Sequence, residues 1–314
     1  MNKITLDTLK KGIFKGLETT WTLGKIIFPI TFIVSILKYT PVIDFLSKAL
    51  QPIMGVFGLS GESAIILVLG NILNLYAGIG AMLTMDLALK EVYILSIMLS
   101  LSHNIIIETA ITTRIGVSPW IVGSIRLGMA FLFAFFINLF WKGGQEKAQY
   151  LLNPPDTEVL TSWPEIVLNA GQTAAMGIIQ IIVIVIPVML FIQILKDVDI
   201  LPLLARMMSP LTRLIGVSEK TGVTLLAGLL FGIAYGAGVI IQTAREENLS
   251  KKDIYLVSIF LVSCHAVIED TLIFAPLGVN VIYLLLVRVA LALILTVVTA
   301  SFWRKVESRT TAIE

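Results

Sequence analysis

Hydrophobic residues occur along this chain in long runs that polar residues rarely interrupt. A run of about 20 apolar residues can cross the hydrocarbon core of a bilayer as a helix. Several segments reach or approach that length, and these are residues 22–39, 63–83, 120–141, 171–195, 221–241, 254–267 and 279–303. The pattern predicts an all-α integral membrane protein that crosses the bilayer several times.

Composition supports this prediction and limits the kinds of partner that we expect. Apolar residues make up 57% of the 314 residues and charged residues 14%, whereas roughly a quarter of residues are charged in soluble domains. A net charge of +2 gives no reason to expect a nucleic-acid partner. The single cysteine, Cys264, excludes a disulfide framework. We expect the lipid bilayer as the main partner, in a multi-pass protein of a bacterial-type inner (plasma) membrane.

The first 20 residues differ from the rest of the N-terminal region. They are amphipathic, carry four lysines and lack a small-residue cleavage site before Trp21. They therefore do not resemble a cleavable signal peptide. We expect residues 1–20 to form an interfacial helix.

The chain is an internal duplication. Residues 101–117 recur without a gap as residues 263–279, and earlier positions match at an offset of 158. The matched pairs are Pro29/Pro187, Gly70/Gly228, Gly78/Gly236, Gly80/Gly238, His103/His265, Glu108/Asp270, Thr109/Thr271 and Arg126/Arg288. The repeats predict a first membrane unit over 21–142, a linker over 143–164, a second unit over 165–305 and a polar tail over 306–314.

Each unit is expected to contain broken or re-entrant helices. The glycine-rich segment 71–80 permits either close helix packing or a local break. In the polar segment that follows, His103 and Glu108 would point about 140° apart on a continuous helix. A hairpin there would bring both side chains into one cavity and would give each unit three crossings, so that the two units are inverted. A continuous crossing would give four crossings and parallel units.

Matched ionisable residues mark the candidate site. Such groups are costly inside a membrane and normally face a cavity or each other. Each half supplies a histidine, an acid, a threonine and an arginine, and the arginines could alternatively neutralise the acids structurally. The predicted substrate-binding residues of this kind are His103, Asn104, Glu108, Thr109, Arg126, His265, Glu269, Asp270, Thr271 and Arg288.

Two kinds of ligand fit these residues. Imidazole with carboxylate suits Zn²⁺, Mn²⁺ or Fe²⁺, and the set His103, Glu108, His265 and Asp270 could bind such a metal. The same groups could hydrogen-bond a polar organic solute, with H⁺ or Na⁺ as coupling ion. The H-E-x-x-H, G-x-S-x-G and P-loop motifs do not occur, so an enzyme is not expected.

The motif N-x-x-N-x-x-x-G-x-G at 71–80, with E-T at 108–109 and E-D-T at 269–271, resembles the nucleoside-recognition or Gate-domain membrane proteins. That family includes spore maturation proteins A and B. It is related to the membrane core of ferrous-iron transporters and to concentrative nucleoside transporters. The resemblance implies inverted repeats, re-entrant hairpins and a solute site between them. It adds Asn71, Gly78, Gly80, Gly236 and Gly238 to the recognition residues.

The leading hypothesis is a secondary transporter for a small polar or anionic solute, such as a nucleoside. The solute would bind near the bilayer midplane at the repeat interface and cross by alternating access. A divalent-metal permease is the alternative. A third hypothesis is a non-transporting scaffold, in which the same residues form buried pairs without a cavity. A homodimer is a further expectation.

Overall fold

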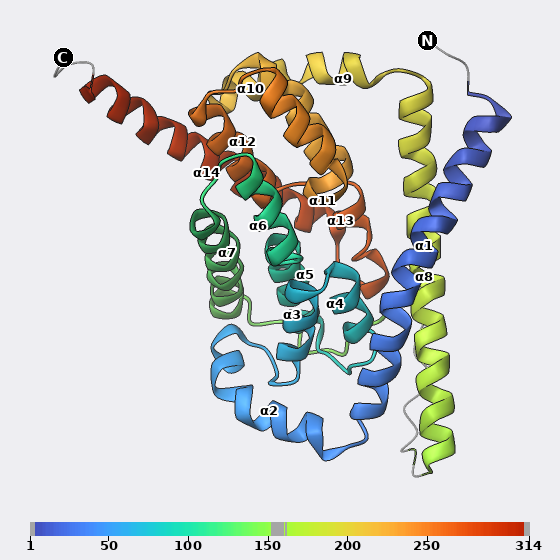
Figure 1. Ribbon diagram of the computed structural model, residues 1–314. Coiled ribbons are helices and arrows are strands. Elements are labelled where there is room, and N and C mark those ends of the chain that lie inside the picture. Colours follow the sequence, from blue (N-terminus) through green and yellow to red (C-terminus); the bar gives the residue numbers. More distant parts are fainter. Residues whose placement is uncertain (1–3, 152–159, 161, 311–314) are drawn as a thin grey trace.

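The computed structural model describes residues 4–151, 160 and 162–310 (Figure 1). The described part contains no β-strand, and its backbone is almost entirely helical. The helices are α1 (Leu6–Leu37), α2 (Pro41–Met54), α3 (Ser63–Ile72), α4 (Leu75–Met82), α5 (Leu89–Ser102), α6 (Ile105–Arg114), α7 (Pro119–Phe140), α8 (Trp163–Asp197), α9 (Leu201–Met207), α10 (Ser209–Ile215), α11 (Gly222–Glu246), α12 (Lys251–Ser263), α13 (Glu269–Leu272) and α14 (Val281–Thr310).

Six helical segments in the described part are long and apolar enough to cross a membrane. They are Leu6–Leu37, Leu89–Arg114, Pro119–Phe140, Trp163–Asp197, Glu219–Glu246 and Val281–Val306. The predicted all-α membrane architecture is therefore confirmed. Two of these segments are interrupted, one between α5 and α6 and the other inside α11, and these interruptions shape the centre of the protein.

Helices α1 and α8 form a long antiparallel pair (Figure 1). Gly12 faces Leu190 and Gly16 faces Ile186. Contact positions thus move forward along α1 as they move backward along α8, as in an antiparallel pair. A Cβ atom added at Gly16 would lie 2.9 Å from the Cα atom of Ile186. Small residues allow helix backbones in a membrane to approach this closely, and glycine spacing thus fixes the register of the pair.

The N-terminal segment differs from the predicted separate interfacial helix. A capping box at Thr5 starts α1, and the helix then continues without a break to Leu37. Its 32 residues span about 48 Å, which exceeds the roughly 30 Å of hydrocarbon in a bilayer. The early turns pack along α8 instead of forming a helix of their own, because Gly12 and Gly16 present no side chain there.

Short amphipathic helices follow each of the two long ones. Helix α2 lies at one end of the molecule, whereas α9 and α10 lie at the opposite end (Figure 1). On α2 the apolar side chains Phe45 and Ile53 are exposed, as expected for a helix that rests on lipid.

The glycine-rich segments form the hairpins, one segment earlier than predicted. In the first half α3 and α4 fold back on each other, since a Cβ atom at Gly78 would lie 3.1 Å from the Cα atom of Gly70. In the second half a Cβ atom at Gly236 would lie 3.1 Å from the carbonyl oxygen of Ala227. Nine residues would span about 13 Å along a continuous helix. The chain therefore folds back within α11 at Gly232, whose φ of +76° suits glycine.

The polar segments are broken helices and not the hairpins that the sequence suggested. In the first half, α5 ends at Ser102 and α6 begins at Ile105, with Asn104 in the left-handed region. In the second half, Ala266 has a φ of +40° between α12 and α13. Each break is bonded to the neighbouring hairpin: Asn104 N donates to Gly70 O at 2.9 Å, and Ala266 N donates to Gly228 O at 3.0 Å.

The described start of the linker is attached to the first half. Ala88 and Lys147 form a β-bridge, and Lys147 Nζ lies 2.9 Å from Asp86 Oδ1. Partial burial alone would raise the pKa of Asp86, but the nearby ammonium groups of Lys147 and Lys38 hold it below its usual value. Linker residues 152–159 and 161 and tail residues 311–314 lie outside the described residues.

The α1–α8 contact predicts that alanine substitution changes the free energy of unfolding much more at one glycine than at another. Gly16→Ala should lower the free energy of unfolding by about 1–3 kcal/mol, because the new methyl group meets backbone atoms that have no free space beside them. Gly171→Ala, on α8, is the control, since no described atom outside the neighbouring backbone of its own helix lies within 4 Å of its added Cβ atom. Thermal unfolding in detergent measures both, and equal midpoints for the two variants would contradict this packing.

Candidate functional site

The helix breaks of the two halves meet at the centre of the protein and bring the two histidines together. The rings of His103 and His265 have centroids 5.3 Å apart. Their residues are 4% and 1% exposed. Both predicted histidines thus lie in one buried place, although 162 positions separate them in the sequence.

Backbone carbonyls orient both imidazole rings. The Nδ1 atom of His103 lies 2.7 Å from the carbonyl oxygen of Leu99, and that of His265 lies 2.8 Å from the carbonyl oxygen of Leu261. A carbonyl can only accept, so each Nδ1 carries a proton and donates. The Nε2 atom of each ring therefore faces the centre of the site.

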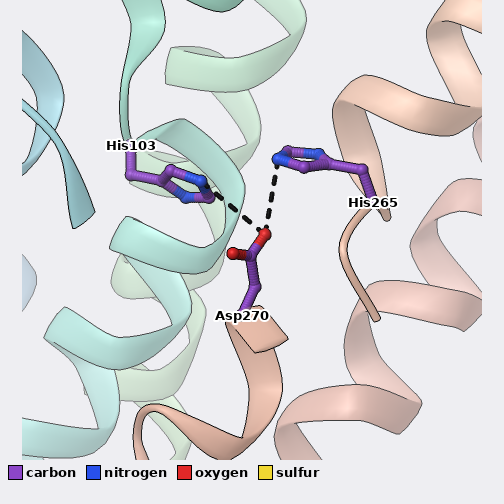
Figure 2. A group of neighbouring side chains, drawn as sticks. All are labelled: His103, His265 and Asp270. Atoms are coloured by element: carbon purple, nitrogen blue, oxygen red, sulfur yellow. Dashed lines mark ion pairs between the residues drawn. The ribbon is translucent and has the colours of Figure 1, made fainter. Parts of the chain in front are cut away.

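Two carboxylates complete a cluster of four groups. Glu108 Oε1 lies 3.5 Å from His103 Nε2 and 3.2 Å from His265 Nε2. Asp270 Oδ2 lies 3.7 Å from His103 Nε2 and 3.4 Å from His265 Nε2 (Figure 2). Each ring thus faces one acid from its own half and one from the other half. We call His103, His265, Glu108 and Asp270 the central cluster.

Arg126 holds the first half of this cluster from behind. Its Nη1 donates to Glu108 Oε2, its Nε donates to Leu101 O at 3.0 Å, and its Nη2 donates to His103 O at 2.6 Å. The side chain is completely buried. One guanidinium therefore neutralises the acid and also satisfies carbonyls that the helix break leaves without intrahelical partners.

Arg288 occupies the matching position in the second half and makes some of the same contacts. Its Nη2 donates to His265 O at 2.5 Å and to Asp270 Oδ2 at 3.4 Å, and its Nη1 donates to Thr271 Oγ1 at 3.1 Å. The two predicted arginines are therefore clamps on the broken helices. This is the structural alternative that the sequence left open.

A cavity of about 250 Å³ adjoins the central cluster. Residues of α1, both hairpin bends and both helix breaks line it, among them Thr22, Asn74, Tyr76, His103, Asn104, Glu108, Phe231, Gly232, Tyr235, His265, Glu269 and Asp270. Across this cavity the Tyr76 hydroxyl of the first half donates to Glu269 Oε1 of the second. The cavity thus lies between the halves, and the ionisable side chains in its wall belong to the helix breaks.

A wider vestibule of about 560 Å³ lies beside this cavity. Thr22, Phe231, Tyr235 and Glu269 line both spaces. Farther out the vestibule is bordered by charged groups of α1 and α8, including Lys15. The two aromatic side chains, on either side of the Gly232 bend, therefore stand between the vestibule and the central cluster.

The predicted residues fall into three groups. Those that line the cavity are His103, Asn104, Glu108, His265, Glu269 and Asp270. Those that hold the cluster from behind are Arg126, Arg288 and Thr271. Those that the structure places elsewhere are Asn71, which donates to Leu67 O, Thr109, whose carbonyl accepts the hydroxyls of Thr112 and Thr113, and the glycines Gly78, Gly80, Gly236 and Gly238.

The glycines act in packing, with one exception. Gly78 and Gly236 let the hairpins close, and Gly80 lies against Thr31 of α1. No other described atom lies within 4 Å of a Cβ atom added at Gly238. The role in recognition that the family resemblance implied for these glycines is therefore at most indirect, through the shape of the hairpins.

Several residues that line the cavity were not predicted from the sequence, although the sequence pattern does mark one of them. Asn74 caps α4 by accepting from Ala77 N at 2.9 Å, and it lies at the hairpin bend that lines the cavity. At the offset of 158 it matches Gly232, the bend of the second hairpin. The second asparagine of the motif, and not Asn71, marks the site. Nothing in the sequence singled out Tyr76 or Tyr235, because each lies in an apolar run.

The arginine clamp predicts a large loss of stability. Arg126→Gln should lower the free energy of unfolding by about 3–5 kcal/mol, since it leaves the buried Glu108 without a cation. The double variant Arg126→Gln/Glu108→Gln should recover part of this loss. Arg206→Gln, on the exposed side of α9, should change stability by no more than about 0.5 kcal/mol. Denaturant unfolding in detergent tests all three, and a neutral Arg126→Gln would contradict the clamp.

Comparison with known proteins agrees with this architecture. The family model Gate, described as nucleoside recognition, matches residues 20–119 and 178–299, one segment in each half. The uncharacterized membrane protein YvoD of Bacillus subtilis (strain 168) is 48% identical over 294 residues, which cover 94% of each chain. No solved structure matches this chain. The protein is a membrane protein and belongs to the Gate, or nucleoside-recognition, family.

Proposed function

We propose that this protein is a secondary transporter of the cytoplasmic membrane, which exposes its central cavity alternately to the two sides and so carries a small polar solute. The cavity at the contact of the two halves, with the ionisable side chains of the central cluster in its wall, is the observation that supports the proposal. Its volume of about 250 Å³ is below the roughly 300–1,000 Å³ that sites for drug-sized ligands have. A small solute is therefore the natural occupant.

The polar groups in this cavity support binding over a purely structural role. Ionisable side chains inside a membrane are costly and usually mark a functional site. Asn104 Oδ1 and His265 Nε2 are both buried without a hydrogen-bond partner among the described residues. A scaffold would be expected to pair such groups and to leave no cavity beside them.

The two halves are, in this proposal, inverted copies of each other. Two observations support the inversion: α1 and α8 run antiparallel, and the short helices that follow them lie at opposite ends of the molecule (Figure 1). With one hairpin and one broken crossing, each half crosses the membrane three times. An odd number of crossings starts the second half on the other side, as in transporters built from inverted repeats.

Inversion identifies the residues that would line the vestibule in the opposite state. At the offset of 158, Thr22 matches Gln180, and Tyr235 matches Ala77. Thr22 is exposed to the vestibule, whereas Gln180 and Ala77 are 4% and 0% exposed. The structure is thus open at one set of positions and closed at the matched set.

Cysteine accessibility tests this alternation. Cys264→Ser, which restores the residue type found at the matching Ser102, gives a background without cysteine. Thr22→Cys should react with a membrane-impermeant thiol reagent from one side only. Gln180→Cys should react from the opposite side only, with a rate that changes when a transported solute is added. Labelling in membrane vesicles of both orientations measures each rate.

An exposed and a buried reference set the limits of this assay. Glu247→Cys, at an exposed side chain just after the end of α11, and Leu99→Cys, at one that is 0% exposed, give the reactivity expected without alternation. If Gln180→Cys stays as unreactive as Leu99→Cys from both sides under every condition, while Thr22→Cys always reacts, the protein is static and the transporter proposal is wrong.

A further inference from the structure

We infer that the central cluster binds one divalent transition-metal ion through His103 Nε2, His265 Nε2 and the carboxylates of Glu108 and Asp270. The inference rests on the proposed function only in placing this ion on a transport path. Binding itself requires only the four groups. Three of them, His103, His265 and Asp270, offer ligand atoms that all lie within 4.8 Å of one another.

The spacing of the four groups matches a metal site. The four distances from Nε2 to carboxylate oxygen are 3.2, 3.4, 3.5 and 3.7 Å. Two ligands of a tetrahedral ion at 2.0–2.1 Å lie about 3.3 Å apart. These contacts are longer than most direct hydrogen bonds between charged partners, which lie at about 2.7–2.9 Å. The four distances between nitrogen and oxygen are thus close to the spacing between ligands of one ion.

The orientation of the rings makes both Nε2 atoms available as ligands. Because Nδ1 of each ring donates to a backbone carbonyl, Nε2 is the nitrogen that faces the two carboxylates, and in a neutral ring it carries the lone pair. A cation between the rings and the carboxylates would bind to both. His265 is 1% exposed, and its Nε2 has no hydrogen-bond partner among the described residues. That atom is buried 3.2 Å from Glu108 Oε1 and is placed to act as a metal ligand.

The surroundings hold the ligands as a metal site requires. A histidine that binds a metal usually donates its other N–H to a carbonyl or carboxylate, which fixes the tautomer and the ring orientation. His103 and His265 both do so. Glu108 Oε2 accepts a hydrogen bond from Arg126, and Glu108 Oε1 faces the rings. The site therefore needs little rearrangement to receive an ion.

The donor set selects the class of ion. Two imidazole nitrogens with carboxylate oxygens suit Zn²⁺, Fe²⁺ or Mn²⁺, whereas Ca²⁺ and Mg²⁺ prefer oxygen ligands alone. Copper(I) prefers sulfur ligands, and the four groups offer none. The inference is thus limited to divalent ions that accept nitrogen and oxygen together.

Metal binding to the purified full-length protein in detergent is the test. After chelation, the protein is titrated with Zn²⁺, Mn²⁺ or Co²⁺, and bound metal is measured by elemental analysis and calorimetry. The wild type should bind one ion per chain. His103→Asn and His265→Asn retain an N–H for the backbone carbonyl and remove the coordinating Nε2. Each variant should bind at least roughly tenfold more weakly, the lower end of what the loss of even an outer-shell partner costs.

Matched controls separate loss of a ligand from loss of folding. Asp270→Asn should weaken binding in the same way, whereas Asp44→Asn makes the same chemical change on the exposed side of α2 and should bind like the wild type. The bound Co²⁺ should show an absorption spectrum of nitrogen and oxygen ligands that changes in each histidine variant. Unfolding curves verify that every variant is folded.

Two outcomes would overturn the inference. One is the absence of stoichiometric metal in folded wild type, which would mean that the cluster holds protons alone. The other is equal affinity in the wild type and both histidine variants, which would place the metal elsewhere. Neither outcome affects the cysteine-labelling test, because that test reports movement of the halves and requires no metal. Conversely, a static protein could still bind the ion.

Discussion

Two buried arginines satisfy the groups that the broken helices leave unpaired at the depth of the membrane, and the centre of this protein depends on them. Backbone groups in a bilayer have no water to bond with, so irregular backbone is tolerated only where protein satisfies it. Arg126 accounts for two carbonyls and an acid in the first half, and Arg288 accounts for a carbonyl, an acid and a hydroxyl in the second. They thus stabilise the helix break beside each histidine.

While the two arginines hold the acids, side chains of each half also face side chains of the opposite half. His265 lies near Glu108, His103 lies near Asp270, and Tyr76 donates to Glu269. An occupant of the cavity would therefore contact both halves at once. Since a ligand shifts a conformational equilibrium only through different contacts in the two states, a site shared between the halves would couple binding to the movement that the transport proposal requires.

The duplication is not perfect, and two of its departures lie at the cavity. Glu269 stands where the first half has Ile107, and Tyr235 stands where it has Ala77. Both residues line the vestibule that is open in the structure. The contacts of the core are repeated, in contrast, down to the bond between each helix break and its hairpin. The scaffold is thus symmetric, whereas the access path carries side chains that the other half lacks.

The sequence predicted much of the fold, because long apolar runs and an exact spacing of matched residues are visible without tertiary contacts. It also predicted that the histidines and acids converge, since the repeat places them at equivalent positions. It did not predict which segment turns back. That choice depends on Gly78 meeting Gly70 and on Gly236 meeting Ala227, contacts that hydropathy does not report. The left-handed backbone at Ala266 had no signal either, because alanine rarely adopts it.

The α1–α8 pair shows the same limit. Amphipathicity predicted a separate interfacial helix for the first 20 residues, but residues 6–20 continue into the rest of α1, and the glycines that attach them to α8 act through the absence of a side chain. Their partner lies about 170 positions away in the chain. Local patterns cannot reveal such a contact.

The measurement that tests the central claim most directly is the distance between α1 and α11 across the vestibule. Spin labels at Lys15 and Val239, which both line it, would be measured by pulsed electron paramagnetic resonance in lipid nanodiscs. A pair at Lys220 and Lys251, both exposed residues of the second half, serves as the reference. If the halves move around a shared site, the first pair will show two distances whose proportions change when a ligand is added, and the reference will show one. A single unchanging distance for both pairs would contradict the account.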